Sequence, residues 1–114
     1  MIGIRGATTV TEDSKDQIVQ KTRELLEDLV VKNNLDKENI VSVFFTMTED
    51  LNSEFPAVAA RGLGWTQCAL MCARELNIKG SLPMCIRVLI HYEGRNNNPV
   101  HVYLNEAKKL RDDL

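Results

Sequence analysis

The stretch Met84-Cys85-Ile86-Arg87-Val88-Leu89-Ile90-His91-Tyr92 decides the fold, because it is an almost continuous apolar run with one full charge in its middle. A short run of this kind predicts a strand in the interior of a sheet. Successive side chains of a strand point to opposite faces. We therefore expect Ile86, Val88 and Ile90 on one face and Arg87 on the other.

Arg87 is the charge in that strand, and its guanidinium stays protonated at any ordinary pH. Burying such a cation without an anionic partner is very costly. The side chain of Arg87 must therefore either reach water or bind an anion. Our hypothesis is that the anion is a substrate.

Length and composition indicate an ordinary globular chain, with one domain over residues 1–114. The net charge of −2 gives no bulk attraction for nucleic acid. No apolar run approaches the about 20 residues of a membrane span, and no signal-peptide core opens the sequence. Three cysteines without a Cys-x-x-Cys pair fit the cytoplasm. Two scattered histidines do not suggest a metal site.

The other segments predict an α+β fold of about five strands with one long and one short helix. Apolar residues at helical spacing follow a capping pattern at Ser14, and Asn33-Asn34 marks the end of this long helix. Pro56 opens the short helix and Gly62 stops it. Strands are expected at residues 2–10, 40–48, 67–71, 84–92 and 101–104. Residues 108–111 fit either a strand or a helix.

One helix covers only one face of such a sheet. The strands at 40–48 and 84–92 carry apolar residues on both faces, which a strand facing water does not need. A neighbouring copy of the chain is the economical cover for the second face. The sequence therefore predicts an oligomer.

Arginines recur at special places in the chain, with a few other polar groups available to join them. The arginines are Arg5, Arg61, Arg87 and Arg111, and the other groups are Cys72, Glu75 and Tyr103. Taken singly, Arg5 fits a solvated charge at a sheet edge and Arg61 a charge at a helix end. Together, several guanidinium forks with one carboxylate and no nucleophile suit a dianionic small molecule.

The chain resembles the AroH-class chorismate mutases, the small monofunctional type. The matching segments run through the whole chain in the family's order: Gly3-Ile4-Arg5-Gly6-Ala7-Thr8-Thr9, Phe55-Pro56-Ala57, Gly64-Trp65, Glu75, Cys85-Ile86-Arg87-Val88, His101-Val102-Tyr103-Leu104 and Leu110-Arg111. The resemblance implies a mixed sheet flanked by a long helix. It also implies a homotrimeric pseudo-barrel with active sites at the subunit clefts. The implied reaction is the pericyclic rearrangement of chorismate to prephenate, toward phenylalanine and tyrosine, without cofactor or metal.

The resemblance also implies roles for individual residues. Arg87 would hydrogen-bond the breaking ether oxygen, Arg5 a substrate carboxylate, and Glu75 the ring hydroxyl. Cys72 and Tyr103 would also bind substrate. The adjacent subunit would contribute Phe55, Ala57 and Arg61 to the same site. Leu110 and Arg111 would form a C-terminal cover.

Some positions depart from the family's pattern. Val58 stands where the family often has Lys, and Leu70-Met71 replaces a smaller, partly polar pair.

Two other functions stay open at this point. Rid-type enamine deaminases share the trimeric architecture and bind a carboxylate with an arginine, but do not require Glu75 or Tyr103. A non-catalytic trimer that binds an aromatic or dicarboxylic metabolite is the other alternative.

Overall fold

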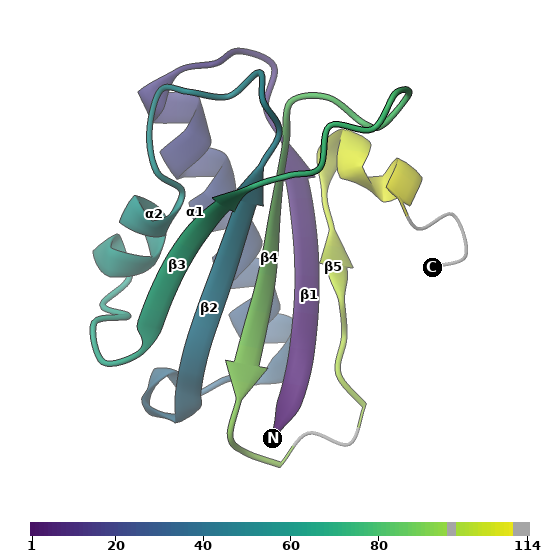
Figure 1. Cartoon of the computed structure of the whole chain (residues 1–114). Coiled ribbons are helices and arrows are strands. Elements are labelled where there is room, and N and C mark those ends of the chain that lie inside the picture. The colour runs from purple at the N-terminus through teal and green to yellow at the C-terminus, as the bar shows by residue number, and fades with distance from the viewer. Residues whose placement is uncertain (96–97, 111–114) are drawn as a thin grey trace.

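A five-stranded mixed sheet forms the body of the computed structural model, which describes residues 1–95 and 98–110 (Figure 1). The strands lie in the order β3-β2-β4-β1-β5. Their bounds are Ile2–Thr9 for β1, Ile40–Met47 for β2, Ala69–Arg74 for β3, Cys85–Tyr92 for β4 and Val102–Tyr103 for β5. The central strand β4 is antiparallel to both β1 and β2, whereas β3 and β5 add in parallel at the two edges. The α+β class predicted for the single chain is confirmed.

Two α-helices lie on the same face of this sheet, α1 from Lys15–Asn33 and α2 from Ala57–Gly62 (Figure 1). Two 3₁₀ helices complete the fold, η1 at Lys37–Asn39 and η2 at Asn105–Leu110. In the described part of the chain, no helix is long and apolar enough to cross a membrane.

The ends of α1 are fixed by the residues that the sequence indicated. The Ser14 hydroxyl accepts a hydrogen bond from the Gln17 backbone N–H at 3.2 Å, which satisfies one of the free donors at the helix start. Asn34 closes the helix in the left-handed conformation, with φ of 52°, which asparagine tolerates better than most residues. Between these caps, Ile18, Leu25 and Leu29 are fully buried against the sheet.

The alternation predicted for β4 is confirmed. Ile86, Val88 and Ile90 are buried on the helix-covered face, and each such burial contributes about 1.5–3 kcal/mol. Arg87 points to the other face and its side chain remains 44% exposed.

Gly6 allows α1 to pack closely on β1. A Cβ atom at this position would lie 3.0 Å from the Cδ1 atoms of both Leu25 and Leu29, and 3.1 Å from the Val102 carbonyl oxygen. These contacts are tighter than most side-chain packing, so a larger residue at this position would push the leucine side chains or the carbonyl aside. Glycine therefore permits the close approach of the helix to the strand that carries Arg5.

One strand differs from the sequence prediction. The third strand was expected at residues 67–71, but β3 runs from Ala69 to Arg74 because its pairing with β2 continues to the pair Met47 and Arg74. Tertiary pairing here overrides local propensity. Of the two alternatives left open for residues 108–111, the structure has the helical one for residues 108–110, which belong to the 3₁₀ helix η2. Residue 111 lies outside the described residues.

The second face of the sheet is open at its centre, while η2 covers only the end beside β1 (Figure 1). Phe44 and Met71 are cross-strand partners on this face, with exposed fractions of 39% and 54%. Both side chains therefore remain exposed in the described part of the chain. The uncovered apolar face that the sequence predicted is therefore present.

Candidate active site

A cavity of about 280 Å³ lies on the open face of the sheet. It is lined by Arg5, Gly6, Phe44, Thr46, Glu75, Arg87, Val88, Leu89 and Tyr103. The sequence predicted four of these as site residues, namely Arg5, Glu75, Arg87 and Tyr103. The fold thus brings residues from near both ends of the chain into one cavity.

Strand register explains how the two arginines meet. In the pairing of β1 with β4, Arg5 lies opposite Leu89 and Ala7 lies opposite Arg87. Arg5 and Arg87 are therefore diagonal neighbours on the same face of two paired strands, within reach of each other's long side chains. Two cations held this close favour a ligand with more than one negative charge.

Glu75 is held at the cavity by both its backbone and its side chain. Its backbone N–H donates to the Met47 carbonyl oxygen at 2.9 Å, which continues the β3 pairing by one residue. Its Oε2 accepts a hydrogen bond from the Thr46 hydroxyl. Its Oε1 lies 3.7 Å from the Arg87 Nε, which is too long for a strong hydrogen bond. The Arg87 guanidinium, still exposed, remains accessible to a ligand.

Tyr103 reaches the cavity through the short strand β5. Tyr103 pairs with Ala7 and so shares the face of Arg5. The preceding segment is tied to β1 as well, because the Arg5 backbone N–H donates to the His101 Nδ1 at 3.0 Å.

Cys85 lies next to Arg87 in β4 but is no nucleophile. Burial raises the pKa of its thiol to about 11, although the nearby positive charge of Arg87 acts in the opposite direction. The thiol packs with Ala7 and Ala107 beneath η2. It is therefore protonated at neutral pH, and only a thiolate attacks readily.

Several predicted site residues lie outside this cavity. Ala57 and Arg61 lie in α2, on the helix side of the sheet (Figure 1), and Phe55 precedes that helix. None of the three lines this cavity, and their assignment to a neighbouring subunit's site stays a prediction. Leu110 packs against the cluster of Ala7 and Cys85. Arg111 lies outside the described residues.

Cys72 was expected to line the same wall as Glu75, but its side chain lies on the opposite face. It pairs with Phe45 in the parallel register of β3 and β2, and packs against the helix-side core. Cross-strand partners share a face of the sheet, so Cys72 follows Phe45 away from the cavity.

Sequence reasoning missed Thr46 and Phe44 as lining residues. Both stand on β2 in alternate positions with the buried residues Val43, Phe45 and Met47. The signal that indicates them is this alternation combined with the pairing of Thr46 and Arg87. That pairing is a property of the folded sheet.

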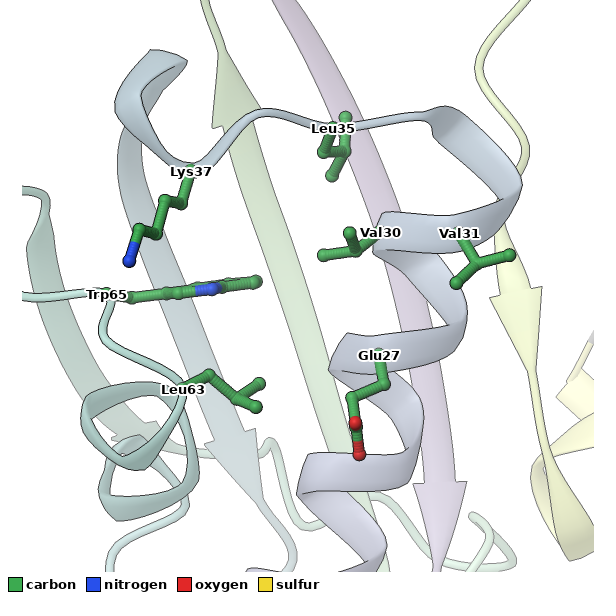
Figure 2. Close-up of a pocket in the computed structure, with 7 residues that line it drawn as sticks. All are labelled: Glu27, Val30, Val31, Leu35, Lys37, Leu63 and Trp65. Atoms are coloured by element: carbon green, nitrogen blue, oxygen red, sulfur yellow. The ribbon is translucent and has the colours of Figure 1, made fainter.

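A second cavity, of about 340 Å³, lies on the helix side of the sheet (Figure 2). Figure 2 shows the Trp65 ring between Lys37 and Leu63 and directed toward Val30 on α1. Its lining is mostly apolar and includes none of the predicted site residues. Among the residues that the structure describes, no group of three or more metal-ligating side chains occurs in either place.

Together, the fold and the cavity on the open face define a small-molecule enzyme site with two arginines, a carboxylate and a phenol. The chain matches the family "Chorismate mutase type I" over residues 1–114, and it belongs to that family.

Two curated proteins support this membership, both named "Chorismate mutase AroH". The one from Thermus thermophilus is 48% identical, with 98% of this chain and 94% of the relative covered. The one from Bacillus subtilis (strain 168) is 40% identical, covering 98% and 91%. A solved structure of a chorismate mutase from Clostridium thermocellum superposes with a TM-score of 0.93 at 47% identity, over 96% of this chain and 99% of that one.

Proposed function

We propose that the cavity on the open face is the site at which this chorismate mutase rearranges chorismate to prephenate. One observation carries the proposal: Arg5, Glu75, Arg87 and Tyr103 converge on a single hollow from β1, the end of β3, β4 and β5. Chorismate offers two carboxylates, an ether oxygen and a ring hydroxyl. Two guanidinium groups, a carboxylate and a phenol complement that set.

The first contribution of the site is restraint. The enolpyruvyl arm of chorismate must fold over the ring before the new bond can form. Arg5 and Tyr103 bind the carboxylate of the arm, and the binding energy offsets the entropic cost of reaching this conformer. The walls formed by Phe44 and Leu89 limit the space available to other conformers.

The second contribution is electrostatic. As the ether bond breaks, its oxygen gains negative charge and the ring gains positive charge. Arg87 donates to the oxygen, and a donor already in place costs no reorganisation at the moment of reaction. Glu75 accepts from the ring hydroxyl and places its carboxylate near the electron-poor ring. No nucleophile and no proton transfer are part of this scheme.

The neighbouring subunit completes the site in our proposal. A homotrimer would cover the open face at Phe44 and Met71, and bring Phe55, Ala57 and Arg61 of the adjacent copy to the rim. Leu110 and Arg111 would form the C-terminal cover. We also assign the enzyme to the cytoplasm, since Cys68, Cys72 and Cys85 are all free thiols.

The test of the reaction is the loss of chorismate absorbance with the purified chain, with prephenate identified as the product. Binding of chorismate without turnover would favour a metabolite-binding trimer. Hydrolysis of an enamine substrate without chorismate turnover would favour a deaminase.

Light scattering after gel filtration tests the assembly. We expect the particle mass to be three times the chain mass of 12.9 kDa, because the apolar open face favours association over exposure to water. A fully active monomer at assay concentration would contradict a site completed by a second copy.

The pH profile tests the absence of proton transfer. No histidine or cysteine is among the described residues that line the cavity. We expect kcat to stay nearly flat between about pH 6 and 8, because general acid–base catalysis is what produces a bell-shaped profile. A steep bell centred in that range would instead indicate acid–base chemistry.

A further inference from the structure

Thr46 stands between the two charged groups at the heart of the cavity. In the sheet it is the cross-strand partner of Arg87 on β4 and of Ala73 on β3. Its side chain is half-buried, and it lines the cavity beside Glu75. Its hydroxyl donates to Glu75 Oε2.

The two oxygens of the Glu75 carboxylate therefore have different surroundings. Oε2 is occupied by the Thr46 hydroxyl, while Oε1 lies 3.7 Å from Arg87 Nε without a strong hydrogen bond to it. Arginine and carboxylate frequently form a bidentate pair with two short bonds. Here the Thr46 hydroxyl binds one carboxylate oxygen, and the other oxygen stands off the guanidinium.

We infer that Thr46 is a positioning residue, whose hydroxyl keeps Glu75 turned toward substrate and keeps Arg87 from being captured by Glu75. This inference rests on the roles proposed above for Glu75 and Arg87. Because the Thr46 hydroxyl donates its hydrogen bond to Oε2, it is Oε1 that accepts a hydrogen bond from the ring hydroxyl of the substrate. Without the hydroxyl, the carboxylate rotates and the ion pair competes with substrate for both groups.

The test compares Thr46→Val with Thr46→Ser in the full chain. Valine keeps the branched shape that suits a strand but removes the donor, whereas serine keeps the donor. We expect Thr46→Val to lower kcat by about 10-fold, because general mispositioning of a catalytic group is costly even over small distances. Thr46→Ser should stay within about threefold of the parent, since the donor that carries the effect is retained. Thr46→Ala serves as a second donor-free variant if valine impairs folding.

Thr22→Val is the matched control. Thr22 is fully buried on α1, and within the described residues its hydroxyl has no hydrogen-bond partner. The same chemical change at this position removes an unsatisfied buried group, so the melting temperature should rise or hold. Its kcat and KM should remain those of the parent.

A double-mutant cycle with Glu75→Ala separates the positioning role from a merely structural one. If Thr46 acts through Glu75, adding Thr46→Val to Glu75→Ala causes no further loss of kcat. Parent-like kcat and KM in both Thr46→Val and Thr46→Ala would overturn the inference, as would an undiminished loss in the Glu75→Ala background. Absence of chorismate turnover in the parent chain would overturn the proposed function itself, which is a distinct result.

Discussion

Replacing Arg87 with alanine should leave a folded protein whose kcat is lower by about 100-fold or more, the usual cost of removing a donor to a developing oxyanion. The fold survives because the Arg87 side chain is 44% exposed and its contact with Glu75 is long. A neutral isostere of the guanidinium should fail as well, since it preserves shape without charge. The measurement is the rate of chorismate loss, with circular dichroism to verify folding.

Arg23→Ala is the control for this variant. Arg23 lies on the exposed side of α1, where its Nε is 3.4 Å from Glu27 Oε1. Removing such a surface pair costs about 0.3–0.5 kcal/mol, and the residue is remote from the cavity. Its kcat should equal that of the parent. Near-normal turnover in Arg87→Ala would defeat the role assigned to that guanidinium.

Replacing Phe45 with alanine should lower the free energy of unfolding by about 3–5 kcal/mol. Phe45 is fully buried in the core between β2 and the helices. A domain of this kind has a total stability of about 5–15 kcal/mol, so the variant is expected to be close to unfolding. Urea titration followed through the fluorescence of the single tryptophan, Trp65, measures the change.

Phe44→Ala is the matched comparison, because the two phenylalanines are adjacent in sequence and point to opposite faces. Phe44 is 39% exposed and makes an edge-to-face contact with His91, with ring centroids 5.7 Å apart. Such a contact contributes about 0.5–1.5 kcal/mol. Within the chain, Phe44→Ala should therefore lower the free energy of unfolding by less than Phe45→Ala does. Equal losses at the two positions would mean that Phe44 is buried as deeply in the assembled protein as Phe45 is within the chain.

The features that the sequence predicted well are those set by local repetition. The alternation of β4 follows from the period of a strand, and the ends of α1 follow from the capping behaviour of Ser14 and Asn34. Arg5, Glu75, Arg87 and Tyr103 were identified through the family resemblance, and the structure brings all four to one cavity. The need for a cover over the second face followed from apolar residues on both sides of two strands.

The features that escaped prediction depend on register between distant strands. Cys72 lies on the helix side because it pairs with Phe45, and a shift of one residue would reverse its face. The contact between Thr46 and Glu75 joins positions 29 residues apart across two strands. Propensity and periodicity describe each strand separately, so neither indicates which side chains meet across them.

The close packing of α1 on β1 at Gly6 has a consequence for how this pocket can be changed. A larger residue at Gly6 would have to displace two leucine side-chain ends or a backbone carbonyl oxygen. Phe44, on the opposite wall, lines the cavity and is partly exposed, so its side chain can change with less disturbance of the core. Libraries that seek new specificity should therefore begin at Phe44 and keep Gly6.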